Sequence, residues 1–168
     1  MADFNIAFDR TMLNEGGYKL TSIAADKGGQ TYAGLSRVAN PGWSGWIAID
    51  RGDTPATEQV RAIYRANYWN PIKADEITKQ SIANSLYDFA VNAGVRTAVK
   101  LAQVVVGVVP DGSIGPKTLA SLNTVEEEFF KLAYAMAKVA RYESIVSKDR
   151  SQDKFLLGWI RRVLKEVS

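Results

Sequence analysis

Apolar residues recur at helical spacing through most of the chain. Phe4, Phe8 and Met12 lie four residues apart and predict a first helix that stops near the glycine pair 16–17. Further helices are predicted over 54–69, 76–93, 96–106, 116–122, 125–146 and 153–167. Their apolar stripes include Ile82, Leu86, Phe89 and Ala93, then Phe129, Leu132, Met136 and Val139, and finally Phe155, Trp159 and Val163. The pattern is typical of a mainly helical protein.

One segment after the first helix lacks this spacing. Between residues 18 and 31, Leu20 and Ile23 are followed by the turn sequence Asp26-Lys27-Gly28-Gly29. Short apolar stretches on either side of a glycine-rich turn are typical of a β-hairpin. We therefore expect a small β lobe near the N-terminus of a mainly α fold.

The stretch 40–53 is rich in glycine, proline and tryptophan. This composition predicts an ordered loop rather than a flexible linker. Trp43 and Trp46 fit two roles equally well, as platforms on which a sugar stacks or as anchors in the core.

The composition limits the chemistry that the protein can use. Its 168 residues suit about one domain, and 46% hydrophobic residues suffice for a core without a disulfide or a metal. The chain has no cysteine and no histidine, which excludes Ser-His and Cys-His catalysis and histidine zinc sites. Acid–base chemistry must therefore use carboxylates, lysines or tyrosines, and we expect no metal and no cofactor.

The net charge of +3 does not indicate a nucleic-acid partner. Basic residues are scattered, apart from Arg161, Arg162 and Lys165, and this trio fits a solvated helix end where cations favour the helix dipole. The segment 112–118 is superficially similar to a phosphate-binding loop. Pro116 removes a backbone N–H that such a loop needs, so we expect no nucleotide binding.

The sequence shows no targeting or membrane-spanning segment. Its first ten residues include acids and no continuous apolar stretch, unlike a signal peptide. The longest apolar run, residues 101–109, is interrupted by Gln103 and is far shorter than the roughly 20 residues that span a bilayer. We expect synthesis in the cytoplasm and no stable membrane insertion.

Glu15 is placed where a carboxyl can act as an acid. It ends the first predicted helix, and the negative end of the helix dipole tends to raise the pKa of a carboxyl there. Gly16 and Gly17 allow a sharp turn and the close approach of a polysaccharide. Glycosidic bond cleavage requires a protonated acid and commonly a second carboxylate. From the local sequence alone, however, an ordinary surface acid before a glycine cap explains Glu15 better.

Two segments carry a family resemblance. Asn14-Glu15-Gly16-Gly17-Tyr18, followed by the segment 26–36 that ends in Gly34-Leu35-Ser36, resembles the lysozyme-like N-acetylmuramidases of glycoside hydrolase family 108. Residues 110–119, Pro-Asp-Gly-Ser-Ile-Gly-Pro-Lys-Thr-Leu, are similar to the peptidoglycan-binding region that follows the catalytic part in that family. The resemblance implies a lysozyme-like α+β fold with a catalytic region over 1–94. A helical peptidoglycan-binding region over 95–168 is expected to pack into the same globule.

The resemblance also implies an activity and its residues. The expected reaction is lysozyme-type hydrolysis of the β-1,4 bond between N-acetylmuramic acid and N-acetylglucosamine in bacterial peptidoglycan. Glu15 is the implied catalytic acid, while Asp26 and Thr31 occupy the places of the second carboxylate and of the threonine that holds water. The implied substrate contacts are Tyr18, Gly29, Tyr32 and Asn92.

Departures from the phage-type pattern leave alternatives for these residues. Ten residues separate Glu15 from Asp26 and four separate Asp26 from Thr31, a longer first arm and a shorter second arm than phage-type lysozymes show. Asp26 fits a turn-initiating role equally well, and Thr31 fits an ordinary strand position. Tyr18 and Tyr32 are of a type that more often packs than contacts substrate.

Two other functions remain open at this point. A lytic transglycosylase needs only Glu15, and a non-catalytic wall-binding protein would use residues 111–119 and the loop tryptophans. A phage or prophage endolysin fits the expected activity best. Such a protein is expected to be monomeric, and it acts in the periplasm or cell wall once a holin or a secretion partner has released it.

Overall fold

The structure is a computed structural model that describes residues 1–14, 17–22 and 29–167. The chain forms two compact units. The first comprises Asp3–Asn70, and the second comprises Met1–Ala2 with Pro71–Ser168. Within the described ranges, no helix is both long and apolar enough to cross a membrane.

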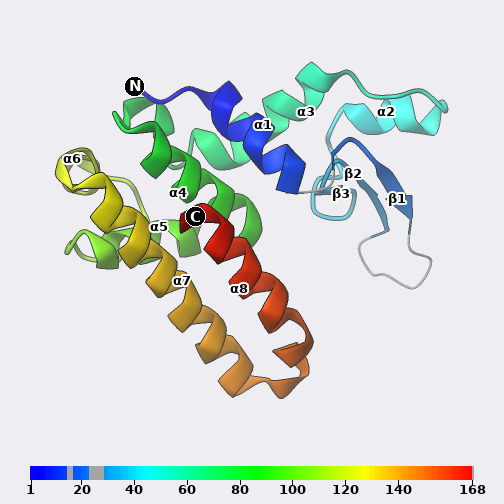
Figure 1. The fold of residues 1–168 in the computed structure, drawn as a ribbon. Helices are drawn as coiled ribbons and strands as arrows, with labels where there is room; N and C mark the ends of the chain where they lie inside the picture. The colour runs from blue at the N-terminus through cyan, green and yellow to red at the C-terminus, as the bar shows by residue number, and fades with distance from the viewer. Residues whose placement is uncertain (15–16, 23–28, 168) are drawn as a thin grey trace. The chain divides into compact units, whose positions relative to one another are not determined.

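The first unit combines helices with a small sheet (Figure 1). Its elements are α1 (Phe4–Asn14), β1 (Leu20–Ser22), β2 (Gln30–Tyr32), β3 (Leu35–Ser36), α2 (Gly45–Asp50), α3 (Thr57–Tyr64) and the π-helical turn η1 (Arg65–Trp69). The predicted stripe of α1 is buried, and its aromatic rings form the core of the unit. Phe4 packs edge-on against Trp69 with ring centroids 5.5 Å apart, and Phe8 packs the same way against Tyr64 at 5.6 Å.

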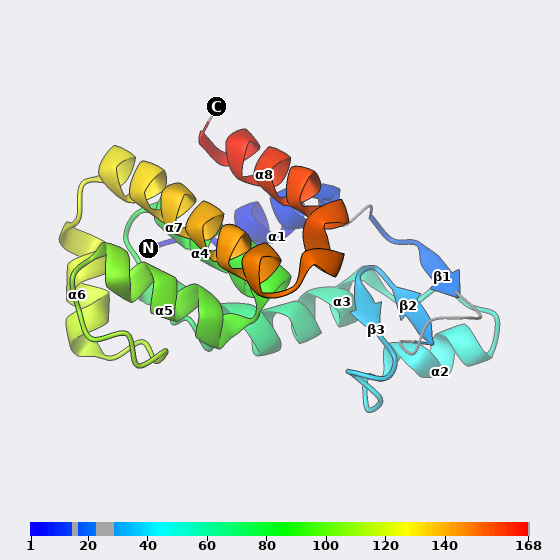
Figure 2. The same cartoon turned by 90° about the horizontal axis from the view of Figure 1, so that it is seen from below.

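The three described strands pair antiparallel in the order β1-β2-β3 (Figure 2). Thr21 lies opposite Thr31 in the register of β1 and β2. Ala33 and Gly34 join β2 to β3 with φ values of 49° and 78°, the left-handed backbone that two-residue hairpin turns require. The predicted β lobe is therefore present, while the segment 23–28 lies outside the described residues.

The stretch 40–53 contains a helix, α2, where the sequence predicted a loop. A helix of six residues is too short for its apolar spacing to be recognised. Trp43 and Trp46 are 7% and 3% exposed, and a Cβ atom on Gly45 would lie 2.3 Å from the Trp43 ring. The tryptophans are therefore core anchors, and Gly45 permits the close approach of the indole.

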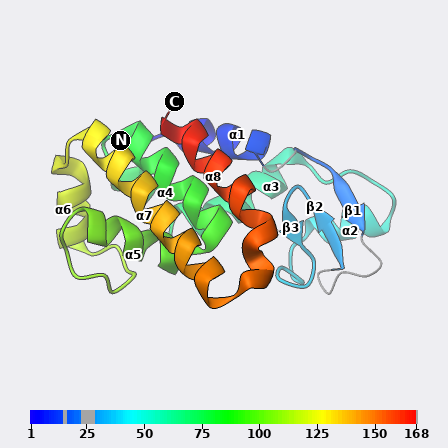
Figure 3. The ribbon, with the colours of Figure 1, turned by 60° about the horizontal axis from the view of Figure 1, so that its bottom comes forward.

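Within the described residues of the second unit, all regular secondary structure is helical. Its elements are the short 3-10 turn η2 (Ala74–Glu76), α4 (Gln80–Ala93), α5 (Val95–Val105), α6 (Pro116–Thr124), α7 (Glu127–Lys148), the 3-10 turn η3 (Arg150–Gln152) and α8 (Asp153–Val167). Helix α7 packs against α4, α5 and α8. Figure 3 shows α7 and α8 side by side.

The core-facing side of α7 differs from the predicted stripe. Phe129 and Met136 of that stripe are more than half exposed. The buried side consists of residues four apart that begin one position later, namely Phe130, Tyr134, Lys138 and Tyr142. A lysine in the middle of this row hid it from the apolar pattern, because lysine is almost never fully buried unless it is paired.

Candidate functional site

Helix α1 ends in a glycine turn. Gly17 has a φ of +77°, and its N–H donates to the carbonyl oxygen of Met12 at 3.0 Å. A bond that spans five residues at the end of a helix closes the last turn and satisfies a free carbonyl. Glu15 and Gly16 lie outside the described residues, between the last residue of α1 and this turn.

The strand β2 carries two of the predicted site residues on opposite faces. Successive residues of a strand point to opposite sides of the sheet. Tyr32 is 4% exposed on the core side, whereas Thr31 is half-buried on the other. Thr21 of β1 donates its hydroxyl to the Thr31 carbonyl at 3.4 Å. Thr31 and Tyr32 are neighbours in the chain, but the sheet places their side chains on opposite surfaces.

The Tyr32 ring packs in the core, and its hydroxyl has no partner among the described residues. The ring stacks on Trp43 with centroids 6.0 Å apart and planes 23° apart. No described residue accepts from or donates to the Tyr32 hydroxyl, and burial raises its pKa. A buried polar atom without a partner is rare in native proteins.

A pocket opens beside the glycine turn. It has a volume of about 560 Å³ and is lined by Asp9, Met12, Leu13, Gly17 and Tyr18. Tyr18 is 41% exposed. Burial raises the pKa of Tyr18, with Arg61 opposing and Asp9 and Tyr32 adding to the rise. The Tyr18 hydroxyl therefore keeps its proton at neutral pH and can donate a hydrogen bond to a ligand.

Sequence reasoning missed the ion pair that supports this pocket. Arg61 of α3 donates to Asp9 of α1 at 2.7 Å and to the side-chain oxygen of Asn5 at 2.9 Å. Its guanidinium also lies over the Phe8 ring, 4.6 Å from the centroid. The two partners of the ion pair are 52 residues apart, so no local pattern links them.

The remaining predicted contacts lie in different places. Gly29 is exposed immediately before β2, with a φ of +62° that favours glycine. Asn92 is exposed on α4 in the second unit, where its side-chain oxygen accepts from the Tyr142 hydroxyl at 3.5 Å. Asp26 falls in the segment outside the described residues. Within the described ranges, no three acidic side chains gather as a metal site would require.

Two family models match the chain. The model described as "Glycosyl hydrolase 108" matches residues 8–94, which is more than half of the chain. The chain belongs to the glycosyl hydrolase 108 family. A second model, described as "Predicted Peptidoglycan domain", matches residues 97–164. The protein is therefore a glycoside hydrolase whose substrate is peptidoglycan.

A solved structure supports the same assignment. The structure titled "Structure of Brucella abortus SagA" is 27% identical, covers 98% of this chain and 91% of its own, and has a TM-score of 0.73. The lysozyme-like α+β fold expected from the sequence is confirmed. A search among curated proteins finds no significant match to this glycosyl hydrolase 108 member.

Gln103 organises the motif of residues 110–119 in the peptidoglycan-domain region. It is 1% exposed, and its amide nitrogen donates to Asp111, to the Ser113 carbonyl and to Thr118 at 2.8–3.1 Å. Its amide oxygen accepts from the Gly112 N–H at 2.8 Å. The acid and the threonine of the motif therefore shape the loop. A pocket of about 420 Å³ beside it is lined by Val108, Val109, Asp111, Gly115, Pro116, Lys117 and Thr118.

Proposed function

We propose that the protein is an N-acetylmuramidase that cleaves the β-1,4 bond between N-acetylmuramic acid and N-acetylglucosamine. The observation that carries the proposal is the pocket beside the end of α1, because Gly17 and Tyr18 line it and directly follow Glu15 and Gly16 in the chain. Glu15 acts as the general acid. In a chain without histidine, a carboxyl is the group that can protonate the leaving oxygen.

The other implied residues have supporting roles in this proposal. Asp26 activates water as general base, and Thr31 on β2 helps to orient that water. This arrangement inverts the anomer and requires the two carboxyls to be about 6.5–9.5 Å apart. Tyr18, Gly29 and Tyr32 of the first unit contact the sugar chain, and Asn92 on α4 of the second unit is a separate proposed substrate contact. Tyr18, which is 41% exposed and lines the pocket beside the end of α1, supports this role.

The test compares Glu15→Gln with Asp53→Asn, an exposed acid of the same unit that lines none of the pockets described above. Loss of the general acid should lower clearing of purified sacculi by about 10²- to 10⁴-fold, with the thermal midpoint nearly unchanged. Asp53→Asn should clear sacculi at the wild-type rate. Retention of more than a third of the activity by Glu15→Gln would place the chemistry elsewhere.

Product analysis separates hydrolysis from the alternative reaction. Mass spectrometry of the muropeptides should show a reducing end, and an anhydro end lighter by one water would identify a lytic transglycosylase instead. Proton NMR of the first-formed reducing end should show the inverted anomer. A retained anomer would rule out Asp26 as a base acting through water.

The delivery route is also part of the proposal. We infer a phage or prophage endolysin that is made in the cytoplasm and released to the wall by a holin or a secretion partner. Expression of the chain in a bacterial host with and without a pore-forming partner tests this. Lysis should require the partner, and rapid lysis without one would contradict the proposed route.

A further inference from the structure

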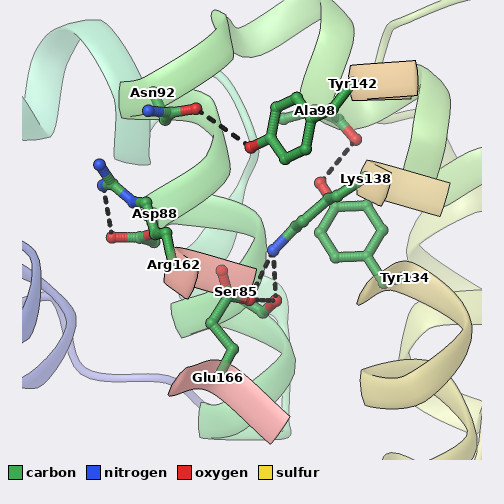
Figure 4. Close-up of polar contacts among 9 residues, drawn as sticks. All are labelled: Ser85, Asp88, Asn92, Ala98, Tyr134, Lys138, Tyr142, Arg162 and Glu166. Carbon is green, nitrogen blue, oxygen red and sulfur yellow. Dashed lines mark hydrogen bonds and ion pairs between the residues drawn. The ribbon is translucent and has the colours of Figure 1, made fainter. Parts of the chain in front are cut away.

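Helix α8 is held in one rotational setting by two charged pairs on its inner side. Arg162 pairs with Asp88 of α4 at 3.1 Å, and Glu166 accepts from Lys138 of α7 at 2.5 Å (Figure 4). Val163 between them is 3% exposed. A rotation of the helix would leave buried charges without partners, which is strongly unfavourable. The opposite side of α8 therefore stays in contact with solvent.

That opposite side combines leucines with cations. Leu157 and Leu164 are 59% and 55% exposed, and their spacing of seven residues places them on one face. Arg161 lies between them on the same face, and Lys154 and Lys165 flank it. Arg161 and Lys165 have no ion-pair partner among the residues that the structure describes, so their charge is free to meet a ligand.

The neighbouring helix α7 adds exposed apolar side chains. Leu132 and Met136 are 54% and 68% exposed. Residues 129–142 of α7 and 154–165 of α8 contain seven basic residues and no acid. Four of the seven remain once Lys138 and Arg162 have entered their buried pairs and Lys131 has paired with Glu128. We call this surface the α7/α8 outer face and define it by Leu132, Met136, Leu157, Arg161, Leu164 and Lys165.

Two of the acids nearest to this surface are in ion pairs, while Glu143, seven residues after Met136 on α7, is exposed and accepts from the Ser147 hydroxyl. Glu128 binds Lys131 at 3.0 Å at one end of α7, and Asp153 lies 3.7 Å from Arg150 at the start of α8. The α7/α8 outer face is therefore apolar and positively charged at once. A surface of this kind is complementary to one that offers an apolar layer beneath negative charges.

We propose that the α7/α8 outer face docks on the surface of an anionic phospholipid bilayer. The leucines and the methionine enter the boundary between headgroups and acyl chains, while Arg161 and Lys165 extend to the phosphates. Glycan strands offer hydroxyls and amides rather than a continuous apolar layer, so they match the cations but not the leucines. The docking is peripheral and reversible, and it holds the enzyme at a membrane that borders its substrate.

The experiment measures partitioning of the full-length chain onto vesicles by sedimentation. Binding is expected to vesicles that contain phosphatidylglycerol and not to vesicles of phosphatidylcholine alone, and it should weaken as salt rises. Arg161→Glu with Lys165→Glu should weaken binding at least about 30-fold, since each cation near an anionic surface contributes about fivefold. Arg51→Glu with Lys73→Glu makes the same change of charge at exposed sites elsewhere and should bind like the wild type.

The leucines distinguish a membrane from simple charge attraction. Leu157→Ser with Leu164→Ser keeps every charge and should also weaken vesicle binding by at least about tenfold, because it removes apolar area from the contact. Circular dichroism and thermal midpoints verify that each variant is folded. Equal losses in the outer-face and control charge variants, or no binding to anionic vesicles, would overturn the proposal. If the wild type does not bind vesicles and the leucine variant no longer pellets with sacculi, the face binds the wall. If the wild type does not bind vesicles and the leucine variant loses a dimer that the wild type forms, the face contacts a second copy of the chain.

Discussion

Tyr64 donates a hydrogen bond of 2.9 Å from its buried hydroxyl to the carbonyl oxygen of Ala33. Ala33 is the first residue of the turn between β2 and β3, and its φ of 49° is uncommon for any residue with a side chain. The bond therefore connects α3 to a strained turn that directly follows Thr31 and Tyr32. It fixes the end of the strand on which the proposed site depends.

Tyr64→Phe should lower the free energy of unfolding by about 1–3 kcal/mol, because it leaves the Ala33 carbonyl buried without a donor. Urea unfolding followed by circular dichroism measures this change. Tyr142→Phe is the matched control, since its hydroxyl reaches Asn92 only at 3.5 Å, and it should cost less than about 1 kcal/mol at neutral pH. Equal losses of unfolding free energy in the two variants would show that the hydrogen bond to Ala33 stabilises the fold no more than the longer contact between Tyr142 and Asn92.

Tyr32→Phe should behave in the opposite way. The hydroxyl that it removes has no partner among the described residues, so the free energy of unfolding should stay the same or rise slightly. If the hydroxyl binds the sugar chain, KM should rise about 2- to 10-fold, which corresponds to one hydrogen bond, with kcat little changed. A loss of stability like that of Tyr64→Phe, with KM unaltered, would make this hydroxyl structural.

The positions of the long helices could be predicted from the sequence, although the stripe expected to be buried on α7 is largely exposed. The bounds expected for α8, 153–167, agree with the structure, and the stripe of α4 that includes Ile82 and Phe89 is buried as expected. The glycine motif after α1 was equally readable, since a helix that ends in a left-handed turn requires glycine. Local sequence patterns were sufficient to predict a feature where the residues of a single element determine it.

Features that depend on distant partners were not readable. Lys138 is buried because Glu166 reaches it from another helix, and Arg61 supports the pocket because Asp9 lies across from it on α1. The placement of Thr31 and Tyr32 on opposite faces follows from the strand geometry, but the sequence did not show which face is buried. These relationships arise only when separate elements pack together.

The Lys138–Glu166 pair should show the cost of an unpaired buried charge. Lys138→Met leaves Glu166 without its partner and should lower the free energy of unfolding by about 3–5 kcal/mol. Lys138→Met with Glu166→Leu removes both charges and should be less destabilising than the single change. Urea unfolding of the two single variants and the double variant measures the coupling between the residues. Removal of the surface pair Glu128–Lys131 is the control and should cost no more than about 1 kcal/mol of unfolding free energy. If the losses of unfolding free energy from the single Lys138 and Glu166 variants simply add up in the double variant, this interpretation is contradicted.

Tyr142 should make stability depend on alkaline pH. Burial raises the pKa of Tyr142 from 10.0 to about 12 in the folded protein, with Arg162 opposing the rise. The unfolded chain therefore releases this proton first, so the stabilising contribution is complete below pH 10.0 and is lost as the pH rises towards about 12. Denaturant unfolding from pH 9 to 12 should show a steeper loss for the wild type than for Tyr142→Phe. Parallel curves above pH 10 would show that the folded protein does not protect this hydroxyl.

Gln103 is the residue whose loss should separate wall binding from catalysis. Gln103→Leu removes a buried amide that joins Asp111, Gly112 and Thr118, so several polar groups lose their partner at once. The expected cost is at least about 2 kcal/mol of unfolding free energy, together with weaker pelleting on purified sacculi, because the loop of residues 110–119 loses its internal support. Hydrolysis of a soluble chitooligosaccharide should fall much less, because no residue of this loop belongs to the proposed catalytic set. Gln152→Leu is the control, since within the described part of the chain its amide contacts Asp149 and Ser151 on a surface turn. If Gln103→Leu is folded and pellets on sacculi as the wild type does, this loop does not contribute to binding the wall.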